Sequence, residues 1–286
     1  MDIKTIGVVG AGTMGNGIAQ VASMAGYDVI MSDIEDRFVQ NGLKSIDKFL
    51  SKSVEKGKLS ADDKNAIMGR IKGTTDMTAM KDADLVVEVV VEVMDIKKKV
   101  FKQLDEITKK EAILATNTSS MSVTEIANAT SRPDKVVGMH FFNPVPLMRL
   151  VEVIRGMKTS DETIALTMEL AKKLGKEPVE VKVDVPGFLA NRLMIAVAVE
   201  AIKLYEQGIA SKEDVDKAAK LGLNYPMGPF ELMDLTGVDI NYHVMDYFYK
   251  ELPKELKWDP PLTIKNMVKA GLLGRKTGAG WYDYNK

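Results

Sequence analysis

Short apolar runs alternate with longer segments of helical period through the first half of the chain, and this alternation constrains the fold most strongly. The strand-like runs are Ile3–Val9, Val29–Ser32, Leu85–Val91, Ile113–Thr116 and Val136–Met139, and the helical segments include Asn16–Ala25, Phe38–Lys56 and Ile96–Lys109. Nearly continuous apolar strands are typical of a parallel sheet buried on both faces. The pairs Ser60 with Asp63 and Ser122 with Glu125 predict two further helix starts. We therefore predict an α/β fold with a doubly wound, mostly parallel sheet.

The pattern changes near residue 184. Asp184-Val185-Pro186-Gly187 contains a Pro-Gly pair, which is a strong turn signal. The segments beyond it have a helical period: Phe188–Gln207, Ser211–Leu221, Ile240–Lys250 and Thr263–Ala270. We therefore predict an α/β domain over residues 1–184 and an all-helical C-terminal domain over residues 185–286, which serves substrate binding and dimerisation. Two domains also suit the length of 286 residues, at roughly 150 residues per domain.

Composition excludes several classes of function. The absence of cysteine excludes thiolate nucleophiles, disulfides and cysteine-ligated zinc. The 39 Lys and Arg residues balance 40 Asp and Glu residues, so the chain lacks the basic excess of nucleic-acid and acidic-membrane binders. The longest apolar run, Leu193–Val199, is far shorter than the ~20 residues of a membrane helix, and no signal peptide opens the sequence. We therefore expect a cytoplasmic protein that binds neither nucleic acid nor membrane.

A glycine-rich motif follows the first strand. Gly10-Ala11-Gly12-Thr13-Met14-Gly15 fits G-x-G-x-x-G, where the glycines permit a tight turn, approach of the backbone to a pyrophosphate, and close helix packing. Asp33 ends the second strand and is spaced to bind the ribose hydroxyls, and its charge would repel a 2′-phosphate. The alternatives are a glycine-rich turn without a ligand and an FAD site, since flavoproteins share the motif. The motif in this context predicts a Rossmann-type domain that binds NAD.

The chain has only two histidines, His140 and His243. His140 follows the strand Val136–Met139, and strand carboxyl ends are where such sheets bind ligands. Glu152 stands alone in the apolar run Leu150–Ile154, where pairing with His140 would offset the cost of its burial and orient the imidazole as a general base. A structural histidine is the alternative for His140. His243 has aromatic neighbours in a helical segment, so we predict a packing role, and we expect no metal site.

Seven motifs occur in the order found in a known family. They are Gly7–Ala19, Thr116–Ser120, Gly138–Pro144, Leu150–Ile154, Pro186–Arg192, Pro226–Asp234 and Gly274–Tyr284. Through them nearly the whole chain resembles the 3-hydroxyacyl-CoA dehydrogenases, most of all the short bacterial 3-hydroxybutyryl-CoA dehydrogenases. The resemblance implies an enzyme that interconverts (S)-3-hydroxybutyryl-CoA and acetoacetyl-CoA by exchanging a hydride with NAD. It also implies a homodimer.

The resemblance also assigns roles to individual residues. It implies that His140 is the catalytic base with Glu152 as its partner, that Ser119 hydrogen-bonds the substrate oxygen at C3, and that Asn191 completes the polar pocket. Together with the glycine motif it gives the cofactor-binding set Gly10, Gly12, Thr13, Met14, Gly15, Asp33, Glu92, Lys97, Asn117 and Asn143. Ser119 and Asn191 each have a simpler explanation as a helix cap.

A stripe of lysines recurs every four residues at Lys44, Lys48, Lys52 and Lys56. This spacing places them on one helix face, where a solvated surface is the ordinary explanation. Because the family binds the CoA phosphates on this helix, the resemblance implies that Lys52 and Lys56 contact CoA.

Three alternatives to this function remain open. The first is an enzyme that prefers longer acyl chains or NADP, because neither chain length nor cofactor choice is fixed by the motifs. The second is another β-hydroxyacid dehydrogenase, although those enzymes use a catalytic lysine in place of the His140–Glu152 pair. The third is a non-catalytic relative of the lens-crystallin kind, which need not keep Ser119, His140, Glu152 and Asn191 together.

Overall fold

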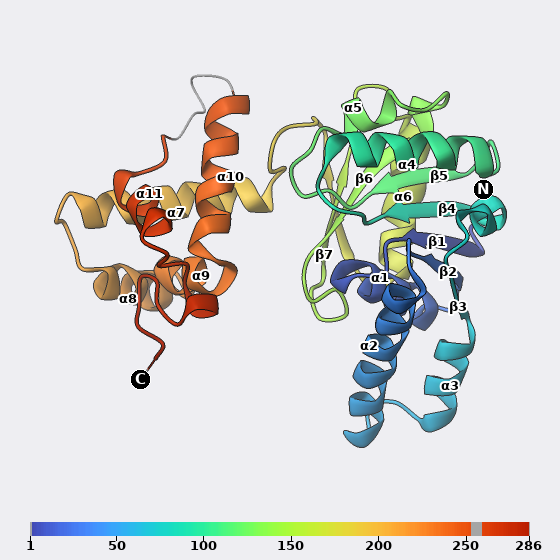
Figure 1. Cartoon of the computed structure of the whole chain (residues 1–286), viewed down its shortest axis with the longest axis horizontal. Helices are drawn as coiled ribbons and strands as arrows, with labels where there is room; N and C mark the ends of the chain where they lie inside the picture. The colour runs from blue at the N-terminus through green and yellow to red at the C-terminus, as the bar shows by residue number, and fades with distance from the viewer. Residues whose placement is uncertain (1, 253–258, 286) are drawn as a thin grey trace. The chain divides into compact units, whose positions relative to one another are not determined.

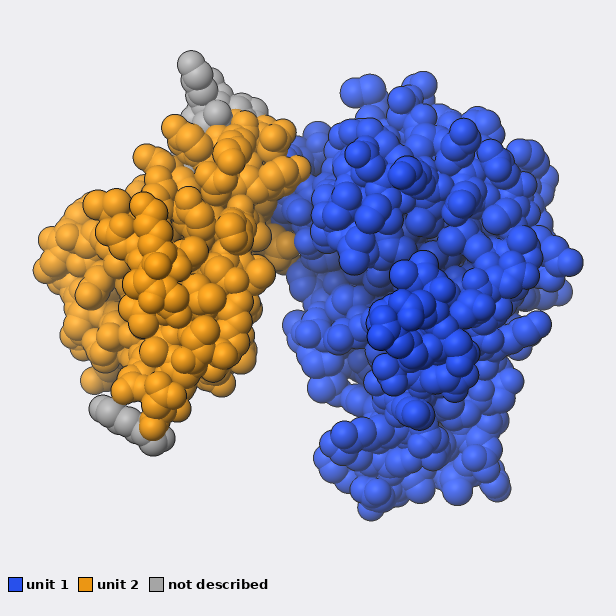
Figure 2. Space-filling model, in the orientation of Figure 1, with its two compact units in different colours: residues 1–188 blue, residues 189–286 orange. Residues whose placement is uncertain are grey.

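The computed structural model describes residues 2–252 and 259–285, and the chain divides into two compact units. Figure 2 colours the first unit, residues 1–188, blue and the second, residues 189–286, orange. The division falls just after the boundary predicted at residue 184. Phe188, the last residue of the first unit, has a φ of 50°, in the left-handed region that few residues other than glycine adopt.

An eight-stranded sheet forms the centre of the first unit (Figure 1). Its strands are β1 Thr5–Val9, β2 Asp28–Ser32, β3 Ile71–Thr74, β4 Leu85–Glu88, β5 Ile113–Thr116, β6 Val136–Phe141, β7 Leu150–Ile154 and β8 Glu177–Val181. They lie in the order β3-β2-β1-β4-β5-β6-β7-β8, and all neighbouring pairs are parallel except β6 with β7. The predicted α/β fold with a mostly parallel sheet is therefore confirmed.

Helices cover both faces of this sheet. The α-helices are α1 Thr13–Met24, α2 Asp36–Glu55, α3 Ala61–Gly69, α4 Met94–Ile107, α5 Val123–Ala127 and α6 Asp161–Lys173, with short 3₁₀ helices η1 Met77–Asp82 and η2 Pro133–Lys135. Buried side chains of α1, α2 and α6 form one core with the strands, and those of η1, α4 and α5 form a second core on the opposite face. Two buried faces explain why the strands are apolar throughout.

The second unit is helical in its described part. It contains α7 Ala190–Glu206, α8 Lys212–Gly222, α9 Pro229–Thr236, α10 Val238–Glu251, α11 Leu262–Lys269 and the short 3₁₀ helix η4 Arg275–Thr277. Its separate core includes Ile195 and Val199 of α7, Phe230 of α9 and the fully buried Met245 of α10. No helix in the described parts of either unit is long and apolar enough to cross a membrane.

Several elements differ from the prediction. Strands β3 and β8 and helices α6 and α9 were not expected, and β7 was recognised only as an apolar run. Helix α1 begins at Thr13 instead of Asn16, which places Gly15 inside its first turn. Strand β6 continues through Phe141, so His140 lies within the strand and not after it. The expected caps are present, because Ser60 and Ser122 each accept a hydrogen bond from the amide three residues later.

Candidate active site

Most predicted site residues of the first unit lie along one edge of the sheet. Strands β1, β2, β4, β5 and β6 are parallel neighbours, so their carboxyl ends lie together. The glycine-rich turn follows β1, while Asp33 follows β2, Asn117 follows β5, and His140 lies one residue before the end of β6. Doubly wound sheets bind their ligands at this edge. It is therefore the candidate active site.

The glycine-rich turn leaves no room for side chains at two of its three glycines. Gly10 has a φ of 111°, and a Cβ there would lie 2.6 Å from the carbonyl oxygen of Val89. A Cβ on Gly15 would lie 1.8 Å from the carbonyl oxygen of Gly10, so helix and turn are packed backbone to backbone. A Cβ on Gly12, by contrast, meets no atom within 4 Å. The space above Gly12, at the N-terminus of α1, suits a pyrophosphate, because helix N-termini attract anions.

Asp33 binds the backbone of this turn. Its Oδ2 accepts a hydrogen bond from the Ala11 amide at 2.7 Å, and its Oδ1 accepts one from the Ile34 amide at 2.7 Å. A carboxylate in this position can also accept bonds from ribose hydroxyls. The nearby cation Arg37 is paired with Glu35, at 2.8 Å between Nε and Oε2. The turn, the helix N-terminus and Asp33 together fit a dinucleotide whose ribose carries no 2′-phosphate.

His140 and Glu152 form a buried pair. They lie directly opposite each other in the antiparallel register of β6 and β7, so both side chains project from the same face of the sheet. His140 Nδ1 is 2.7 Å from Glu152 Oε2, and the glutamate is fully buried. The imidazole packs against Phe142 and Phe188, with ring centroids 4.5 and 5.7 Å away. A histidine held in this way has one ring nitrogen fixed by the carboxylate and the other available for proton transfer.

The asparagines at this edge differ in their surroundings. Asn117 is partly buried, and its Oδ1 accepts a hydrogen bond from the Phe141 amide at 2.9 Å, which ties the end of β5 to the end of β6. Asn143 is exposed in the loop after β6, where it precedes a cis peptide bond to Pro144. The nicotinamide contacts predicted for both asparagines stay predictions.

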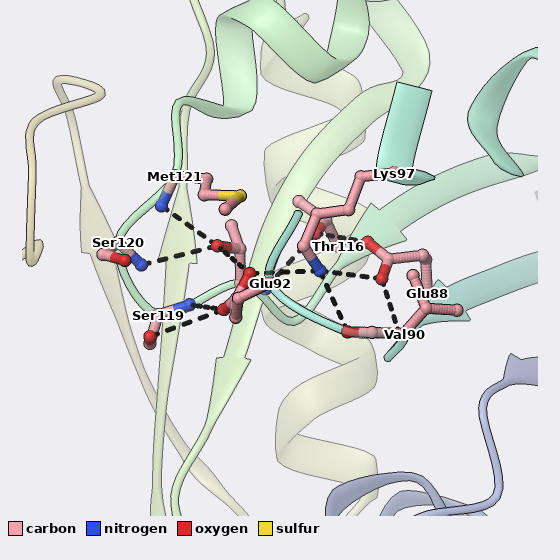
Figure 3. Close-up of polar contacts among 9 residues, drawn as sticks. Glu88, Val90, Glu92, Lys97, Thr116, Ser119, Ser120 and Met121 are labelled. Carbon is pink, nitrogen blue, oxygen red and sulfur yellow. Dashed lines mark hydrogen bonds and ion pairs between the residues drawn. The ribbon is translucent and has the colours of Figure 1, made fainter. Parts of the chain in front are cut away.

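Glu92 and Ser119 are brought together by the loops after β4 and β5, as Figure 3 shows. Glu92 accepts a hydrogen bond from the Ser119 amide at 2.9 Å, and Lys97 Nζ lies 3.3 Å from the same carboxylate. Lys97 is 1% exposed and forms a closer ion pair of 2.8 Å with Glu88. The cofactor contact predicted for Lys97 stays a prediction, and in this structure its ammonium is held by the two glutamates.

The remaining predicted residues belong to other elements of the chain. Lys52 and Lys56 are exposed, in the last turn of α2 and at its C-terminal cap. Asn191 is the second residue of α7, in the second unit. His243 is exposed on α10. Within residues 2–252 and 259–285, no group of three or more His, Cys, Asp or Glu side chains is arranged to hold a metal ion.

Comparison with known proteins identifies the family. Residues 5–185 match the family described as 3-hydroxyacyl-CoA dehydrogenase, NAD binding domain, and residues 187–284 match its C-terminal domain. The chain belongs to the 3-hydroxyacyl-CoA dehydrogenase family. This dehydrogenase is an oxidoreductase, and its first unit is the NAD-binding domain that the glycine motif predicted.

Individual relatives cover nearly the whole dehydrogenase. It is 49% identical over 281 residues to the 3-hydroxybutyryl-CoA dehydrogenase of Clostridioides difficile, covering 98% of this chain and 99% of the relative. It is 42% identical to the human mitochondrial hydroxyacyl-coenzyme A dehydrogenase, covering 99% of this chain and 91% of the relative. The crystal structure of (S)-3-hydroxybutyryl-CoA dehydrogenase from Ralstonia eutropha superposes with a TM-score of 0.96 at 46% identity, with full coverage of both chains.

Glu88 is the residue of this dehydrogenase that the sequence reasoning missed. It ends β4 and is fully buried, where its carboxylate bonds the Lys97 ammonium and the Thr116 hydroxyl. Its signal was present, because it is the one charged residue within the apolar run Leu85–Val91. A lone carboxylate in a buried strand requires partners, as Glu152 does in β7.

Proposed function

We propose that this dehydrogenase interconverts (S)-3-hydroxybutyryl-CoA and acetoacetyl-CoA, with His140 as the general acid and base. The observation that carries the proposal is the buried His140–Glu152 pair, 2.7 Å apart, at the ligand-binding edge of an NAD-binding sheet. The names of relatives from Clostridioides difficile and Ralstonia eutropha, both 3-hydroxybutyryl-CoA dehydrogenases, support the four-carbon substrate.

The pair explains how the protein moves the proton. With Nδ1 protonated and donating to Glu152, the Nε2 of His140 carries the lone pair that accepts the proton of the C3 hydroxyl. The buried carboxylate then stabilises the imidazolium. At the same time the hydrogen on C3 leaves with both electrons of its bond as hydride, and the C3–O bond becomes a carbonyl. NAD supplies the acceptor for that hydride when it is bound. In the reverse direction the protonated His140 returns its proton to the ketone oxygen.

Ser119 and Asn191 complete the proposed reaction. We assign the Ser119 hydroxyl to the C3 oxygen, where a donor stabilises the negative charge that develops in the reducing direction. The family resemblance assigns Asn191 to the same polar pocket. The exposed Lys52 and Lys56 are assigned to the CoA phosphates, since ammonium groups at the end of α2 attract such anions.

The test is NADH oxidation with purified protein and 3-ketoacyl-CoA substrates of four to ten carbons. We expect His140→Ala to lower kcat at least ~100-fold, the contribution typical of a general acid or base, with NADH affinity nearly unchanged. The matched control is His243→Ala, which removes the exposed second histidine and should retain full activity. Comparable turnover in His140→Ala refutes the general-base role. A higher catalytic efficiency with ten carbons than with four refutes the proposed substrate.

We also propose that two copies of the chain associate through the second unit. A groove of about 540 Å³ is lined mainly by apolar side chains of α7 and α8, among them Val197, Leu204 and Val215. Leu223 beside it is 66% exposed, and such exposed apolar surface is typical of interfaces. Sedimentation equilibrium should give twice the chain mass of 31.5 kDa. A mass of one chain at micromolar concentration contradicts this part of the proposal.

A further inference from the structure

Glu88 is a buried carboxylate with no part in the reaction steps above. It is fully buried at the end of β4, in register with Val9 of β1 and Thr116 of β5. Its Oε1 accepts hydrogen bonds from the Val90 amide at 2.7 Å and from Lys97 Nζ at 2.8 Å, while its Oε2 accepts one from the Thr116 hydroxyl at 2.7 Å. A buried charge with both oxygens bonded in this way is firmly fixed in place.

Lys97 transmits this anchoring to a second carboxylate. Its side chain is 2% exposed, and its ammonium lies between Glu88, at 2.8 Å, and Oε2 of Glu92, at 3.3 Å (Figure 3). The side chain of Glu92, the outer of the two glutamates, is 42% exposed. A half-exposed carboxylate is ordinarily mobile, so its position here depends on the buried cation beside it.

Glu92 in turn holds the segment that carries Ser119. Its Oε1 accepts the Ser119 amide at 2.9 Å and lies 3.5 Å from the Ser119 hydroxyl, and its Oε2 accepts the Thr118 hydroxyl at 3.0 Å. A second route reaches the same segment, because the Thr116 hydroxyl that bonds Glu88 also accepts the Thr118 amide at 3.3 Å. Two chains of polar contacts thus start at Glu88 and converge next to Ser119.

We propose that Glu88 is a positioning residue for Ser119, acting through Lys97 and Glu92. The inference rests on the proposed function, which assigns Ser119 to the substrate oxygen at C3. The charges along the chain alternate in sign, so loss of the inner carboxylate leaves the Lys97 ammonium with Glu92 as its only charged neighbour among those described. Glu92 is then drawn toward the ammonium and away from the Ser119 amide, which loosens the orientation of the serine.

The experiment is a double-mutant cycle on acetoacetyl-CoA reduction. Glu88→Gln keeps the size of the side chain and one acceptor oxygen, but it removes the charge and replaces the other acceptor oxygen with an NH2 donor. We expect kcat to fall about tenfold, within the range found for residues that orient a reacting group, with KM for acetoacetyl-CoA changed less than about twofold. In the Ser119→Ala background the same substitution should lower kcat no further. If the effects of Glu88→Gln and Ser119→Ala on kcat multiply in the double variant, the positioning role is overturned.

Two further variants separate positioning from stability. Glu88→Gln combined with Lys97→Met removes both charges of the buried pair, so the midpoint of urea unfolding should recover toward wild type while kcat stays low. Recovery of kcat together with stability overturns the proposal. Asp105→Asn breaks another buried ion pair of the same unit, with Arg132, and any effect it has on kcat should multiply with that of Ser119→Ala. If Glu88→Gln alone does not fold, the combined variant enters the cycle in its place.

The two proposals fail in different ways. A wild-type enzyme that does not reduce acetoacetyl-CoA, or a Ser119→Ala variant with wild-type kcat, refutes the proposed function. If the enzyme is active and depends on Ser119, but the effects of Glu88→Gln and Ser119→Ala on kcat multiply, only the role of Glu88 is refuted.

Discussion

Gly12 and Gly15 stand three residues apart in one motif, but the structure predicts opposite consequences for replacing them with alanine. A Cβ on Gly15 would lie 1.8 Å from the Gly10 carbonyl oxygen, whereas real contacts of this kind are not shorter than 3.0 Å. The carbonyl would have to move by more than 1 Å, yet Gly10 is held in its turn by a hydrogen bond from its amide to the Ser32 carbonyl at 2.8 Å. Because the obstacle is backbone, no side-chain rotation relieves it.

The magnitudes follow from this geometry. Alanine inside a helix is favoured over glycine by about 1 kcal/mol, but overpacking against rigid backbone costs about 3–5 kcal/mol, at or above the upper end of the usual range. We expect Gly15→Ala to lower the free energy of unfolding by about 2–4 kcal/mol, which corresponds to a Tm lower by ~5–10 °C. Gly12→Ala adds its methyl group to open space, so the free energy of unfolding should change by less than about 1 kcal/mol.

The two substitutions also differ in their effect on NADH. The Gly12 methyl group would occupy the space assigned to the pyrophosphate, so we expect NADH affinity to fall at least about tenfold in a protein of normal stability. The assays are urea unfolding and titration of NADH fluorescence. Gly69→Ala is the matched control, because Gly69 is also helical, and a Cβ there meets no atom within 4 Å. Wild-type stability in Gly15→Ala, or wild-type NADH affinity in Gly12→Ala, refutes the reasoning.

Two other predictions concern charged groups. Although burial by itself raises the pKa of Asp105, hydrogen bonds from the Ser131 amide and from Arg132 hold that pKa below its usual value. The stability this contributes is present above the unfolded pKa of about 3.9 and is lost as pH falls through the folded pKa. Asp105→Asn should therefore lower the free energy of unfolding at pH 7 by about 2–4 kcal/mol. In urea unfolding at pH 3, the difference between variant and wild type should be smaller. An equal difference at both pH values contradicts this prediction. Lys52→Ala and Lys56→Ala should each raise KM for acetoacetyl-CoA several-fold at low salt and less at high salt, because exposed charges are screened; an unchanged KM in both variants removes them from the CoA site.

Much of the fold was predictable because its signals are local. The apolar strands β1, β2, β4, β5 and β6 were recognised from continuous runs of residues suited to a sheet buried on both faces. Strand β8 was missed because two glutamates and a proline interrupt the apolar residues of Glu177–Val181, and β3 because Ile71 is the one apolar side chain among its four residues. Both missed strands lie at the edges of the sheet, where one side of the backbone is unpaired and the apolar pattern is weaker.

The sequence by itself identified the NAD-binding domain, the two candidate histidines and the family. The conformations that glycine alone adopts and the spacing of the acid after the second strand are properties of one short segment. The pairing of His140 with Glu152 was predicted from the cost of burying a lone carboxylate, but only the tertiary structure shows the register that brings such residues together. Glu152 faces His140 because β7 adds antiparallel to β6, and Glu88 meets Lys97 because the loop after β4 returns helix α4 over the strand end. Such pairings depend on strand order and register, which the whole core fixes together and no local pattern records.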